Sequence, residues 1–165
     1  MELTRFLTDT TARCTVDLFA TGALAVALTT SAPPAAGFIG TVGFVGDDAR
    51  GALWWEISRE TARGMSGFDE ELLVRDWVGE MANQLLGRVK SQSLARGVAF
   101  RLGTPVVIAG TCLEIAGAVP NHIVLTFLGE HGPLRVSLEL VAAPTLKLRD
   151  DPGEAEAAEG RLWLF

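Results

Sequence analysis

Apolar and polar positions in the first quarter of the chain follow first a helical and then an extended spacing. Apolar side chains recur at helical intervals from residue 3 to residue 18, which predicts an amphipathic helix over about residues 4–20. Gly22 follows this helix, and the alternating segment LAVALTTS predicts a strand. Regular structure should then stop at the Pro-Pro pair that comes next.

A hairpin and two helices are predicted in the middle of the chain. Residues 37–58 contain two apolar runs joined by the polar segment GDDARG, a pattern typical of a β-hairpin. A short helix near residues 58–65 follows. A long helix should then run from about residue 68 to residue 96, with Ser66 or Asp69 as its capping residue.

The second half of the chain is rich in β-branched residues and predicts strands within residues 98–117, 121–129 and 133–142, forming a second antiparallel set. The order of elements therefore predicts an α+β fold, an antiparallel β-sheet with helices packed on one face. Residues 1–145 should form one domain. The acidic, Pro- and Gly-containing segment 146–165, with its apolar end, should lie outside that domain.

Composition excludes several classes of function. A net charge of −6 with scattered basic residues excludes a nucleic-acid surface, which needs clustered Lys and Arg. The charge-free stretch from Leu18 to Gly46 contains too short an apolar core to span a membrane. Cys14 and Cys112 have no partner at metal-ligand spacing and are expected to be small buried hydrophobes. The expected protein is therefore cytoplasmic, with no membrane segment and no metal site.

One side of the long helix carries a polar stripe. At about 100° per residue, Asp76, Glu80, Asn83, Gly87 and Lys90 fall within a sector about 80° wide. The large apolar residues are expected largely elsewhere: Leu72, Leu73, Trp77, Met81, Leu85 and Val89. Such a stripe is often only a solvated face. However, Asn and Gly disfavour a helix interior, so the same residues also suit a face that docks to another molecule.

The segment DWVGEMANQLLGRVKSQSLARGVAFRLGTPVVIAG resembles the CheC, CheX and FliY family of chemotaxis phosphatases. The family signature is an acidic residue or Ser, a Glu four positions later, an Asn three positions after that Glu, and a Pro about twenty-two residues later. Asp76, Glu80, Asn83 and Pro105 match these positions, and the resemblance covers roughly residues 5–141. Because the Glu-Asn motif occurs in a single copy, the chain is most similar to CheX.

The resemblance implies a phosphatase that acts on the aspartyl phosphate of a CheY-like response regulator and forms a homodimer through a sheet edge. Asn83 would orient the attacking water, and Glu80 would pair with the Lys of the receiver domain. Asp76 and Lys90 would contact the rim of the partner, and Gly87 would allow close approach. The Mg²⁺ would be supplied by the receiver, so that the chain needs no cofactor of its own.

Two other interpretations remain open at the level of sequence. The chain could be a noncatalytic adaptor that keeps the fold and binds a receiver or another signalling protein. It could also be a structural dimer whose polar helix face is only solvated. Gln84 stands where many relatives have an apolar residue, which implies an altered floor of the docking surface.

Overall fold

The computed structural model describes residues 2–22, 24–30, 35–113, 115 and 122–149. These parts of the chain form three helices and seven strands. In chain order they are α1 (Glu2–Thr21), β1 (Val26–Thr29), β2 (Ala36–Val45), β3 (Ala49–Ile57), α2 (Arg59–Ser66), α3 (Glu71–Ala95), β4 (Arg101–Leu102), β5 (Val106–Leu113), β6 (His122–Gly129) and β7 (Gly132–Ala142).

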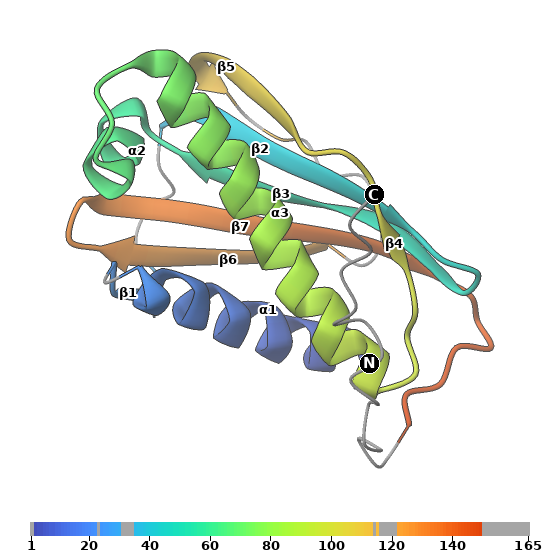
Figure 1. The fold of residues 1–165 in the computed structure, drawn as a ribbon. Helices are drawn as coiled ribbons and strands as arrows, with labels where there is room; N and C mark the ends of the chain where they lie inside the picture. Colours follow the sequence, from blue (N-terminus) through green and yellow to red (C-terminus); the bar gives the residue numbers. More distant parts are fainter. Residues whose placement is uncertain (1, 23, 31–34, 114, 116–121, 150–165) are drawn as a thin grey trace, which may run out of the picture.

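The strands form one antiparallel sheet in the order β1-β6-β7-β3-β2-β4, with β5 also paired to β2. The sequence predicted two antiparallel sets, and that separation is wrong because β7 pairs with β3 and β5 pairs with β2. Helices α1 and α3 lie over the same face of the sheet, with α3 running diagonally across it (Figure 1). The predicted α+β fold is confirmed.

Helix α1 forms despite its many threonines, although the hydroxyls of Thr10 and Thr11 are buried without a hydrogen-bond partner among the described residues. Thr8 and Thr15 each donate their hydroxyl proton to the carbonyl oxygen four residues earlier, at 2.8 Å. Leu18 and Phe19 are buried in the core beneath the helix. Tertiary packing therefore outweighs the weak helix propensity of threonine.

Helix α3 is seated on the sheet by a continuous apolar side. Its buried residues are Val74, Val78, Gly79, Ala82, Leu85, Leu86, Val89 and Ser93. The indole N–H of Trp55, on β3, donates to the carbonyl oxygen of Val78 at 2.9 Å, and Trp55 is almost fully buried. Gly40, on β2, lies directly below this bond, where a Cβ would meet the indole nitrogen at 2.5 Å. A small residue in the sheet thus lets the helix approach closely.

The predicted start of α3 is wrong. The helix begins at Glu71 with Glu70 as the capping residue, and no side chain accepts a capping hydrogen bond there. Ser66 instead belongs to the last turn of α2, which ends at Gly67 in the left-handed conformation. The four-residue link 67–70 therefore takes the place of the predicted cap at Ser66 or Asp69.

The two cysteines differ in burial. Cys14 is buried as predicted, and burial raises the pKa of its thiol. Cys112 is exposed, so its predicted burial is wrong. It lies on β5 with φ 51°, in a stretch where the pairing register with β2 shifts between Ala36 and Phe38. A side chain on this irregular part of β5 does not turn into the core.

The described chain ends beside the C-terminal end of α3. Leu146 and Leu148 pack against the core, and the backbone N–H of Arg149 donates to the carbonyl oxygen of Arg96 at 3.0 Å. Most of the segment 146–165 lies outside the described residues. The proposed domain limit at residue 145 therefore stays a prediction.

Candidate functional site

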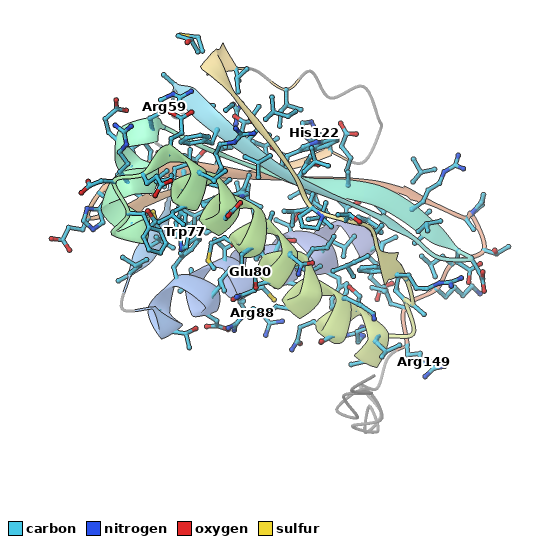
Figure 2. The ribbon with its side chains drawn as sticks, turned by 45° about the horizontal axis from the view of Figure 1, so that its top comes forward. Arg59, Trp77, Glu80, Arg88, His122 and Arg149 are labelled. Atoms are coloured by element: carbon cyan, nitrogen blue, oxygen red, sulfur yellow. The ribbon has the colours of Figure 1, made fainter. Side chains whose placement is uncertain are left out.

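The predicted stripe lies along the outer side of α3. Asp76 and Glu80 are exposed, whereas Asn83, Gly87 and Lys90 are half-buried. Figure 2 shows Glu80 on the outer side of the helix, about midway along it. With a rise of about 1.5 Å per residue, the stripe from the first of these residues to the last is about 21 Å long.

A groove of about 410 Å³ opens between the first half of α3 and the start of β5. It is lined by Leu72, Arg75, Asp76, Gly79, Glu80, Pro105 and Val107. The structure thus brings three signature residues, Asp76, Glu80 and Pro105, to one surface. Close packing makes this possible, because a Cβ on Gly79 would lie 3.2 Å from the Val107 methyl group.

Asn83 lies one turn beyond this groove. Within the described part of the chain, no hydrogen bond to its side-chain amide is found. The amide therefore keeps both its donors and its acceptor for a ligand. One turn further on, a Cβ added to Gly87 would meet no atom within 4 Å, so the surface beside Asn83 is open.

Glu80 is held by a neighbour on the same helix. The side-chain N–H of Gln84 donates to Oε1 of Glu80 at 2.8 Å, across one helical turn. Such pairs restrict a side chain that would otherwise move freely on a helix surface. The second carboxylate oxygen is left to accept a hydrogen bond from a cation. The sequence singled out Gln84 only as a change to the docking surface, and its spacing of four residues from Glu80 was the signal of this contact.

Lys90 lies apart from the groove. It lines a separate hollow of about 230 Å³ at the other end of α3, together with Leu94, Phe100, Arg101 and neighbouring residues of the β2–β3 turn. Ten residues of helix separate it from Glu80, which is about 15 Å along the axis. The structure therefore groups Lys90 with a different part of the surface.

Two leucines at the start of α3 lie on its exposed surface. Leu72 and Leu73 were expected away from the polar stripe, yet they are 59% and 41% exposed. Leu72 precedes Asp76 by four residues and lines the same groove. This spacing places Leu72 on the same side of the helix as the polar stripe. The expectation was therefore wrong for Leu72, because it followed from the apolar character of the residue and not from its position on the helix.

The arrangement presents carboxylates, an amide and a flat helix surface to a partner. In the described residues, no group of three or more His, Cys, Asp or Glu side chains could hold a metal ion. No described helix is both long and apolar enough to cross a membrane. The groove can accept a cationic side chain between Asp76 and Glu80, and the amide of Asn83 can hold a water molecule beside it.

The chain matches one family model and shares its fold with several solved structures. The family model described as chemotaxis phosphatase CheX matches residues 38–128, which include most of β2 and all of β3, α3 and β5. A search of curated protein sequences found no match. The family match covers more than half of the chain and contains all the predicted site residues.

Solved structures share the fold over nearly their whole length. The chemotaxis protein CheX of Vibrio vulnificus is 23% identical, with a TM-score of 0.70 over 82% of this chain and 96% of that one. A CheC-like superfamily protein from Shewanella sp. PV-4 is 21% identical, with a TM-score of 0.70 over 83% and 98%. The CheX–CheY–BeF3–Mg²⁺ complex from Borrelia burgdorferi matches at 17% identity, with a TM-score of 0.65 over 82% and 96%. With its matched family model and this shared fold, the chain belongs to the CheX family of chemotaxis phosphatases.

Proposed function

We propose that this chain accelerates hydrolysis of the aspartyl phosphate of a CheY-like response regulator. The observation that carries the proposal is the position of Asn83 on α3: half-buried, without a hydrogen-bond partner among the described residues, and one turn from an exposed carboxylate. Family membership and the CheX–CheY complex from Borrelia burgdorferi support the partner class. The protein would act in the cytoplasm, where receiver domains are found.

Asn83 would orient the attacking water. An acyl phosphate needs a water molecule in line with the bond that breaks, and a side chain with both donor and acceptor can hold that water. Gly87 leaves open space beside Asn83, which would let the partner backbone approach the helix. The contribution of this chain is therefore positioning, and no covalent intermediate on it is required.

Glu80 would anchor the helix by pairing with the Lys of the receiver. Gln84 already occupies one lone pair of Oε1, which leaves Oε2 for a charge-assisted bond. Asp76 lines the same groove and would add a second contact to the partner. Lys90, about 15 Å further along the axis, would touch only the partner's rim.

The metal ion of the reaction would remain with the receiver. Its role in phosphoryl transfer is to neutralise charge that develops on the phosphoryl oxygens. Asp76 and Glu80 would therefore serve to bind protein groups and not Mg²⁺. Depletion of Mg²⁺ should stop the reaction through the receiver and leave the fold of this chain unchanged.

Homodimer formation is part of the proposal. Strand β5 pairs with β2 on one side, and no partner strand is found on its other side among the described residues. Its residues Val106 and Ile108 are largely exposed. An edge strand with unpaired backbone groups can continue into the sheet of a second copy.

A phosphate-release assay against a panel of phosphorylated receiver domains tests the proposed function. We expect the wild-type chain to accelerate loss of phosphate from at least one receiver. Binding without any acceleration would support the noncatalytic adaptor instead. Neither binding nor acceleration across the panel would leave the solvated-face interpretation as the better account.

A further inference from the structure

The start of α3 and the link before it expose apolar side chains in a row. Phe68 is 40% exposed, and Leu72 and Leu73 follow within the first helical turn. We name Phe68, Leu72 and Leu73 the apolar ridge. Exposed apolar residues that gather in one segment are typical of surfaces that bind another protein.

The ridge is continuous with the groove of the candidate site. Leu72 lines that groove together with Asp76, Glu80 and Pro105. On a helix, residues 72, 76 and 80 succeed one another along one line, at intervals of four. A partner that places a cation against Glu80 therefore lies within about 12 Å of Leu72 along the helix axis.

Charge around the ridge indicates the chemistry of the surface that covers it. Asp69 and Glu70 are exposed between the ridge residues, and Asp76 follows one turn later. Glu71, the other carboxylate at this end, is already paired with Arg59 at 2.9 Å. Arg75, also exposed, lines the groove beside Asp76, so the partner surface that fits the ridge is apolar at its centre and basic where it meets Asp69 and Glu70.

We propose that the apolar ridge is the specificity surface for the response regulator, contacting an apolar patch of its receiver domain that is flanked by basic residues. This inference rests on the proposed function and adds a determinant outside the signature residues. Asn83 and Glu80 would act on the reacting centre, while the ridge would decide which receiver binds.

The test compares Leu72→Ala and Phe68→Ala with Leu28→Ala. Leu28 lies on β1 and is 58% exposed, against 59% for Leu72, so it controls for the loss of an exposed leucine. The binding probe is a receiver from the panel, held in its activated form with Mg²⁺ and beryllofluoride. Circular dichroism and the thermal midpoint of each variant establish that it is folded.

We expect Leu72→Ala to weaken receiver binding about tenfold, because the bound receiver would remove the exposed leucine side chain from water and alanine has less apolar surface to bury. Leu28→Ala should leave both the affinity and kcat at saturating receiver within about twofold of wild type. A reversal of charge, Glu70→Lys, should also slow association and flatten its dependence on salt.

Unchanged receiver affinity of Leu72→Ala would overturn the inference, as would equal weakening by Leu28→Ala. Sedimentation of the free proteins gives a further check: if Leu72→Ala dissociates a homodimer, the ridge is occupied by a second copy and the inference fails. If the wild-type chain binds the receiver without accelerating hydrolysis, the phosphatase proposal fails, while the ridge is still judged by the affinities.

Discussion

Gly40→Ala perturbs the seat of α3 without touching any residue of the site. A Cβ at this position would lie 2.5 Å from the indole nitrogen of Trp55 and 3.0 Å from the carbonyl oxygen of Val78. These two atoms are joined by the 2.9 Å hydrogen bond that fixes the helix to the sheet. The ring of Trp55 is almost fully buried and cannot move away, so the helix must shift or the bond must lengthen.

Overpacking of this kind costs about 1–3 kcal/mol of unfolding free energy. For a chain of this length, each kcal/mol lowers the thermal midpoint by roughly 2–4 °C, so we expect a fall of about 5 °C. Phosphate release should fall as well, because a displaced α3 misplaces Asn83 relative to the partner.

Gly43→Ala is the matched control on the same strand. A Cβ there would have its nearest neighbour, the carbonyl oxygen of Gly51, at 3.9 Å, an ordinary contact. Its thermal midpoint should equal that of wild type or rise slightly, because alanine restricts the unfolded chain more than glycine does. Thermal unfolding followed by circular dichroism measures both variants. If Gly40→Ala were as stable as Gly43→Ala, the close seating of α3 would be refuted.

Three further changes test other parts of the account. Gln84→Leu should raise the KM for phosphorylated receiver about twofold by releasing Glu80, and this effect should vanish in a Glu80→Ala background; equal effects in both backgrounds would refute the contact. Gly87→Ala should raise the free energy of unfolding by up to about 1 kcal/mol while weakening receiver binding, and unimpaired binding would show that close approach is not needed. The pKa of the Glu71 carboxyl lies below its ordinary value of 4.5, chiefly through its hydrogen bond with Arg59. The ionised Glu71 carboxyl therefore stabilises the fold above pH 4.5, and this contribution is lost as the pH falls through its lowered pKa in the folded chain. Glu71→Gln should accordingly lower the thermal midpoint at pH 7 and not at pH 2.

Much of the fold could be predicted from local pattern. The spacing of apolar residues and the turn chemistry predicted the helix α1, the turn between β2 and β3, and the length of α3. The joining of all strands into one sheet could not be predicted from local pattern, because the pairing of β3 with β7 links residues far apart in sequence. No local signal records such a pairing.

The candidate site shows the same division. Asp76, Glu80 and Asn83 could be placed on one side of α3 from periodicity, and resemblance added Pro105. The groove between α3 and β5 could not be foreseen, since it depends on how closely the helix packs at Gly79. The exposed leucines at the start of α3 broke the expected apolar pattern, and local violations of pattern often mark functional surfaces.

The most direct test of the central claim is the rate of phosphate release from a phosphorylated receiver, measured at saturating receiver with wild type and Asn83→Ala. Asn83 is half-buried on α3 and has no hydrogen-bond partner among the described residues, so its loss should not unfold the chain. The account predicts that Asn83→Ala still binds the receiver and loses about 100-fold in kcat. Full activity of Asn83→Ala would contradict it.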